Sequence, residues 1–97
     1  MDSGQNVDTR IEKVFTIPNK LGLHARAASL FVQLSNKFAS EILVRKNDQE
    51  VNGKSIMGIL ILAAAQGADI TLLAEGPDAE EAVRALGDLI NTGFGED

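Results

Sequence analysis

The sequence contains no cysteine, which excludes disulfide bonds, thiolate metal ligands and cysteine nucleophiles. With a single histidine, any zinc site would have to rely on carboxylates alone, so we expect no metal site. The longest apolar run, residues 56–65, is well short of the roughly 20 residues that cross a bilayer. We therefore expect no membrane insertion, and nothing in the sequence implies a cofactor.

An excess of positive charge is also missing. The formal net charge is −5, which speaks against nucleic-acid binding, because that function requires a basic face. The distribution is uneven: residues 18–66 hold six basic and three acidic side chains, whereas residues 75–97 hold one basic and seven acidic. We interpret the basic half as a surface that steers acidic partners, although some of these charges could simply be solvated.

The first ten residues are polar and lack the apolar run of a signal peptide. We expect residues 1–10 to form a disordered extension and residues 11–97 to form one domain of a cytoplasmic protein.

One stretch, residues 21–30, stands out because a glycine-containing loop leads into a helical pattern there. Apolar side chains at positions 27, 30, 31, 34 and 38 have the spacing of a helix with one buried face. The only histidine, His24, then lies near the helix N-cap, where unpaired amides and the helix dipole favour an anion. Arg26 adds a guanidinium whose planar fork suits phosphate. These residues together predict a site where a phosphoryl group could be held on the imidazole.

The residues alone leave a plainer interpretation open. A single histidine at a helix start is most often a solvated residue or a simple cap, and Arg26 could be a surface charge.

Two motifs resemble those of one known family. The segment Gly22-Leu23-His24-Ala25-Arg26-x-Ala28 is similar to the phosphohistidine signature of the HPr family, the phosphocarriers of the bacterial phosphoenolpyruvate-dependent phosphotransferase system. Residues 52–60 resemble that family's regulatory-serine segment, at the family's usual separation from the first motif. The similarity covers about residues 12–90. One departure is Ala27, which stands where the family usually has proline.

This resemblance implies a role for each matched residue. His24 would accept a phosphoryl group on Nδ1 from Enzyme I and pass it to Enzyme II A-type domains, while Arg26 would neutralise the phosphoryl oxygens. Such a carrier is consumed and regenerated, so we do not expect an enzyme. Ser55, which also suits a helix N-cap, would be phosphorylated by an HPr kinase/phosphorylase.

Partner docking is predicted around these sites. Candidate docking residues are Leu23, Ala28, Lys54, Ile56, Met57 and Leu60, although several of the apolar ones could equally belong to the core. On the second helix we expect Ile56, Met57 and Leu60 to be partly exposed, with Ile59, Leu62 and Ala63 facing inward. Nothing suggests an obligate dimer, so a monomer is expected.

The hydrophobic pattern predicts an α+β fold. Strands are predicted at residues 11–17, 40–46, 49–52 and 68–75, and helices at residues 25–37, 56–62 and about 79–90, with residues 93–97 frayed. Because each helix has one apolar side, we expect a four-stranded antiparallel sheet covered on one face by three helices. The family resemblance implies the same open-faced β-sandwich with the order β-α-β-β-α-β-α.

Three functions remain in view. The favoured one is a phosphocarrier in sugar uptake, and the second is a regulatory adaptor of the same fold, in a nitrogen-type branch or controlled by Ser55 phosphorylation. The third is a small-ligand-binding domain that carries the motifs by chance. A nucleotide-binding P-loop at Gly53-Lys54-Ser55 is rejected, because that pattern needs glycine at position 48, which is Asp48.

Overall fold

The computed structural model describes residues 9–96, and the rest of the expected extension, residues 1–8, lies outside that range. The elements follow the order β-α-β-β-α-β-α, as the sequence predicts. They are β1 (Thr9–Thr16), α1 (Ala25–Ser35), β2 (Glu41–Lys46), β3 (Gln49–Asn52), α2 (Ile56–Leu62), β4 (Asp69–Gly76) and α3 (Ala79–Asn91), followed by a 3₁₀ turn, η1 (Gly93–Gly95).

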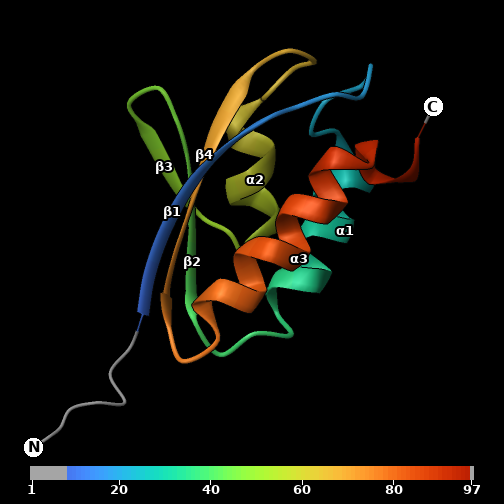
Figure 1. The fold of residues 1–97 in the computed structure, drawn as a ribbon. Helices are drawn as coiled ribbons and strands as arrows, with labels where there is room; N and C mark the ends of the chain where they lie inside the picture. Colours follow the sequence, from blue (N-terminus) through green and yellow to red (C-terminus); the bar gives the residue numbers. More distant parts are fainter. Residues whose placement is uncertain (1–8, 97) are drawn as a thin grey trace, which may run out of the picture.

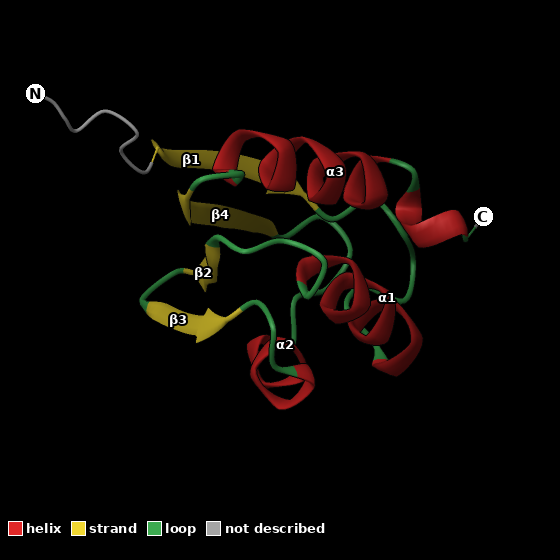
Figure 2. Ribbon diagram, turned by 90° about the horizontal axis from the view of Figure 1, so that it is seen from below, coloured by secondary structure: helices red, strands yellow, loops and turns green. Residues whose placement is uncertain are grey.

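The four strands form one antiparallel sheet in the order β1-β4-β2-β3. All three helices pack on the same face of this sheet (Figures 1 and 2). The predicted open-faced β-sandwich is therefore confirmed. Within residues 9–96, no helix is long and apolar enough to cross a membrane.

The core lies between the sheet and the helices because alternate strand residues and one face of each helix are apolar. On β1, Phe15 is predicted to face inward, and it is buried. Its ring packs against α3 at Gly87, so closely that a Cβ at Gly87 would be 2.6 Å from the ring. The largest fully buried side chains include Ile17, Phe31, Ile42, Ile59, Leu72, Leu86 and Phe94.

Two predicted boundaries are wrong at the ends of the chain. Thr9 and Arg10, expected in the disordered extension, pair with Gly76 and Glu75 as the first residues of β1. The segment 93–96, expected to fray, instead folds back, because Phe94 is buried with 1% of its surface exposed. This second difference determines the shape of the site described next.

Candidate functional site

His24 is the N-cap residue of α1, as the sequence predicts. Its backbone is extended, with φ −78° and ψ −178°, and its carbonyl accepts the first helical hydrogen bond from the Ala28 amide at 2.8 Å. The imidazole makes no capping hydrogen bond, so it does not itself pair with the first-turn amides. The side chain is 29% exposed. A half-exposed ring at a helix start can meet a group delivered from outside.

The loop before α1 is fixed to the end of α2. The Leu23 amide donates to the carbonyl of Ala64 at 2.9 Å, and Gly22 has φ +64°. A Cβ at Gly22 would lie 2.3 Å from the Ala64 oxygen, so only glycine permits this approach. Because Leu23 is then buried, the loop holds His24 in one place at the helix start.

A carboxylate from the far end of the chain lies between the two predicted site residues. Glu96 Oε2 is 2.5 Å from His24 Nε2 and 3.0 Å from Arg26 Nη1. Its other oxygen, Oε1, accepts a hydrogen bond of 2.9 Å from the Asn19 amide. Arg26 and His24 therefore converge on one anionic group, which shows that the imidazole and the guanidinium face the same small volume.

Phe94 brings Glu96 to this place. It is buried with φ 56°, a conformation that few non-glycine residues adopt, and it turns the chain back over the start of α1. Its carbonyl accepts a hydrogen bond of 3.1 Å from Arg26 Nη1. Figure 1 shows the C-terminal turn beside the start of α1. Neither Glu96 nor Asn19 was predicted from the sequence, although an aromatic residue flanked by Gly93 and Gly95 indicates a turn that can be anchored in the core.

Hydrogen bonds hold the pKa of the Glu96 carboxyl below its ordinary value. The largest cause is the bond to His24, followed by the bond to Asn19, and the charges of His24 and Arg26 act in the same direction. Partial burial opposes them. The carboxylate is therefore ionised at neutral pH and acts as an acceptor.

Ser55 lies at the N-cap of α2, where its hydroxyl accepts a hydrogen bond of 3.1 Å from the Gly58 amide. The predicted capping role is thus present. The neighbouring Lys54 extends its ammonium group to the carbonyl of Phe38, at 2.6 Å, and so links the start of α2 to the segment after α1.

Comparison with known proteins identifies the family. Residues 11–92 match the model of the HPr component of the phosphotransferase system, described as its phosphorylation site. The chain belongs to the HPr family. It is 56% identical over 86 residues to the phosphocarrier protein HPr of Neisseria meningitidis, covering 89% of this chain and 97% of that protein.

Other relatives of this HPr-family chain include a protein of a different name. The HPr-like protein Crh of Halalkalibacterium halodurans is 50% identical over 76 residues, which cover 78% of this chain and 90% of Crh. Among solved structures, HPr from Thermoanaerobacter tengcongensis superimposes with a TM-score of 0.87 at 54% identity, covering 90% of this chain and 98% of that one.

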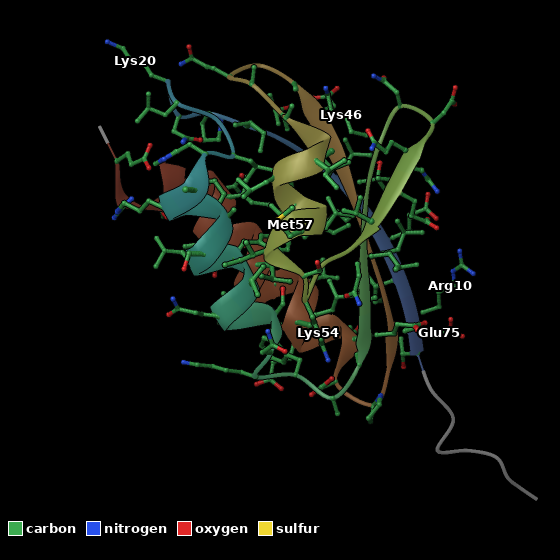
Figure 3. The ribbon with its side chains drawn as sticks, turned by 180° about the vertical axis from the view of Figure 1, so that it is seen from behind. Arg10, Lys20, Lys46, Lys54, Met57 and Glu75 are labelled. Carbon is green, nitrogen blue, oxygen red and sulfur yellow. The ribbon has the colours of Figure 1, made fainter. Side chains whose placement is uncertain are left out.

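The surface next to Ser55 is apolar. Ile56 and Met57 are 42% and 66% exposed, Ile61 is 56% exposed, and Leu60 is half-buried. Figure 3 shows Met57 on α2, with Lys54 near the start of the helix and Lys46 on the neighbouring strand. We call Ile56, Met57, Leu60 and Ile61 the α2 surface.

Three predicted placements near this surface are wrong. Leu23 and Ala28 are 4% and 0% exposed, because the loop before α1 and the inner face of α1 pack into the core, so neither lies on a docking surface. Ala63, expected to face inward, is exposed because the chain leaves α2 there with φ 48°. Leu21, a loop residue that is 67% exposed, was not among the predicted surface residues.

Within residues 9–96 there is no group of three or more His, Asp or Glu side chains that could hold a metal ion.

Proposed function

We propose that this chain carries a phosphoryl group on His24, accepting it from phosphorylated Enzyme I and passing it to Enzyme II A-type domains in the cytoplasm. Membership of the HPr family supports the carrier role. The observation that carries the proposal is the convergence of the His24 ring and the Arg26 guanidinium on a single anion at the start of α1.

The geometry suits a group that must be held and then released. Phosphoryl transfer needs positioning and charge stabilisation more than covalent chemistry from the protein. The Arg26 side chain is 55% exposed, so its unused N–H groups can meet phosphoryl oxygens from solvent. The first-turn amides and the dipole of α1 add further stabilisation of negative charge. The same ring is acceptor and donor, so we assign a stoichiometric carrier and not an enzyme.

We assign partner docking to the α2 surface. This surface is apolar and exposed, and it belongs to the part of the chain, residues 18–66, in which basic residues outnumber acidic ones. The basic residues would attract acidic side chains around the docking surfaces of Enzyme I and Enzyme II A-type domains. The flexible Met57 suits a surface that meets several partners in turn.

Ser55 is the proposed regulatory site, modified by an HPr kinase/phosphorylase. Its hydroxyl is half-exposed at the edge of the α2 surface, between Lys54 and Ile56. A phosphate there would add about two negative charges, which would repel acidic partners and slow the phosphorylation of His24.

The experiment is to incubate the chain with phosphoenolpyruvate and Enzyme I and to map the product by mass spectrometry and phosphorus NMR. We expect one acid-labile, base-stable phosphate, absent from His24→Ala but present in Gln33→Ala, a surface control on the same helix. A phosphate that persists in His24→Ala would contradict the assignment. Because the chain has no Trp or Tyr, absorbance at 280 nm is not a useful readout.

A regulatory adaptor is the second candidate, and the similarity to Crh of Bacillus subtilis, whose solution structure is described as that of the catabolite repression HPr, supports it. The presence of both His24 and Arg26 favours transfer. The two candidates separate when an Enzyme II A-type domain is added, because a carrier passes the phosphate on to that domain, whereas an adaptor binds its target under the control of His24 or Ser55 and transfers no phosphate.

The small-ligand domain has less support. The hollow on the open face of the sheet lies over Leu43 and Leu73 but is rimmed by charged side chains, including Arg10, Arg45 and Glu75, and it is not the closed apolar pocket that such a function requires.

A further inference from the structure

The two nitrogens of the His24 ring have different surroundings. Within residues 9–96, the hydrogen bonds of the ring involve Nε2 alone, which lies 2.5 Å from Glu96 Oε2. An ionised carboxylate can only accept a hydrogen bond, so the proton of the neutral ring is on Nε2 and the lone pair is on Nδ1.

We propose that Glu96 is a positioning residue for phosphoryl transfer: it keeps a proton on His24 Nε2 throughout the cycle, so that Nδ1 is the nucleophile and the ring later leaves as a neutral imidazole. The inference rests on the proposed carrier function and adds a role for a residue that neither the motif nor the helix pattern of the sequence contains.

The chemical steps balance without moving a proton. On arrival, the Nδ1 lone pair forms the N–P bond, and the N–P bond of the donor phosphohistidine breaks with its electron pair returning to the donor nitrogen. The product ring carries phosphorus on Nδ1 and hydrogen on Nε2, and it is cationic. Glu96 neutralises this charge. On delivery, the bond to phosphorus breaks, its electron pair returns to Nδ1, and the ring is neutral again.

Without the proton on Nε2, the same departure would release an imidazolate anion, which is a much poorer leaving group than imidazole. A carboxylate that stabilises the protonated ring therefore favours release, which is what a carrier needs. Uptake benefits too, because the cation formed on phosphorylation is stabilised as it develops.

The structure holds Glu96 firmly enough for this role. Its carboxylate is 15% exposed and is held by Asn19 as well as by His24 and Arg26. Asn19 is itself 4% exposed and donates to both the Gly22 carbonyl and Glu96, which ties the carboxylate to the loop that fixes His24. The buried Phe94 anchors the segment two residues earlier. Since Glu96 contacts Nε2, it can remain in place while phosphorus occupies Nδ1.

The kinetic test compares the parent with Glu96→Gln, which keeps the shape and removes the charge. Glu81→Gln, an exposed position on α3, is the control for loss of one negative charge. We expect Glu96→Gln to slow delivery from phospho-His24 to an Enzyme II A-type domain by about tenfold, with Glu81→Gln at the parent rate. Equal rates in the parent and Glu96→Gln would overturn the proposal. Faster uptake by Glu96→Gln would also overturn it, because the carboxylate would then be an occupant that phosphate must displace.

The spectroscopic test does not depend on phosphorylation. Long-range proton–nitrogen NMR of the His24 ring, at a pH where the ring is neutral, reports which nitrogen carries hydrogen. We expect hydrogen on Nε2 in the parent and a mixture of both forms in Glu96→Gln. Identical ring spectra would overturn the positioning role. If the parent fails to accept phosphate, the carrier function fails, and the ring spectra still decide what Glu96 does.

Discussion

At the scale of single residues, Arg26 shows how one side chain can serve two anions. Its Nη1 donates to Glu96 and to the Phe94 carbonyl, and the side chain is otherwise exposed. The guanidinium has five N–H donors in a rigid plane, so it can keep these contacts and still reach a phosphoryl group on His24. A lysine has no such fork.

We therefore predict that Arg26→Lys slows phosphoryl transfer by roughly tenfold while binding to Enzyme I changes little. Single-turnover phosphorylation of the chain and a separate binding isotherm measure the two quantities. Arg84→Lys, at an exposed position of α3, is the control for replacing an arginine by a lysine away from the site. Wild-type transfer by Arg26→Lys would remove the assigned role of the guanidinium.

At the scale of elements, two glycines with positive φ show two different reasons why a side chain is unfavourable. One position combines backbone strain with a steric collision, and the other has backbone strain alone. At Gly22, with φ +64°, a Cβ would collide with the backbone of Ala64, whereas at Gly67, with φ +88°, a Cβ meets nothing within 4 Å. We predict that Gly22→Ala lowers the free energy of unfolding by more than about 2 kcal/mol and Gly67→Ala by about 1 kcal/mol or less. Urea titrations followed by circular dichroism measure both, and equal losses would show that the loop does not depend on this approach.

We predict that stability depends on pH through Asp78, the residue before α3, which contacts the residues just before β2. Asp78 accepts hydrogen bonds from the Ser40 hydroxyl and from the amides of Ala39 and Ser40. These bonds, the Ser40 hydroxyl first, hold the pKa of the Asp78 carboxyl below its ordinary value. The stabilisation is therefore complete above the ordinary aspartate value of about 3.9. It is lost as the pH falls through the lower pKa of the folded state.

The expected result is that the parent is more stable than Asp78→Asn at neutral pH and that the difference shrinks below about pH 4. Urea midpoints measured from pH 7 down to acid test this. Ser40→Ala, which keeps the carboxylate but removes its strongest donor, should show a weaker pH dependence than the parent. A difference that grows on acidification would show that the sign is wrong.

At the scale of the whole molecule, the sequence predicts the elements well and the site only in part. The helix pattern after residue 24 and the capping residue Ser55 are local signals, so α1 and α2 begin where expected. Periodicity does not report contacts between distant segments. Asn19 and Glu96 are 77 residues apart and meet only when α3 has packed on the sheet and Phe94 has entered the core.

The two misplaced docking residues, Leu23 and Ala28, have different causes. Leu23 and Ala28 flank His24 in the motif, but the motif does not indicate which side chains face the core. The helical spacing of apolar residues in α2 correctly predicts that Ile56 and Met57 are exposed, because Ile59 and Leu62 form the opposite, buried face of the helix. Leu23 lies in the loop before α1, where no periodicity indicates which side chains face the core. Ala28 lies within α1, three and seven residues before the buried Phe31 and Ser35, so helical spacing does place it on the inward face and its prediction as a docking residue did not follow that spacing.

The most direct test of the account is discharge of the phosphorylated chain. The phosphoprotein is separated from Enzyme I and phosphoenolpyruvate, mixed with an unphosphorylated Enzyme II A-type domain, and both masses are followed in time. We predict that phosphate leaves His24 and appears on the acceptor in equal amounts, regenerating the original chain. Release of the phosphate into solution, or its retention on His24 in the presence of the acceptor, would contradict the carrier function.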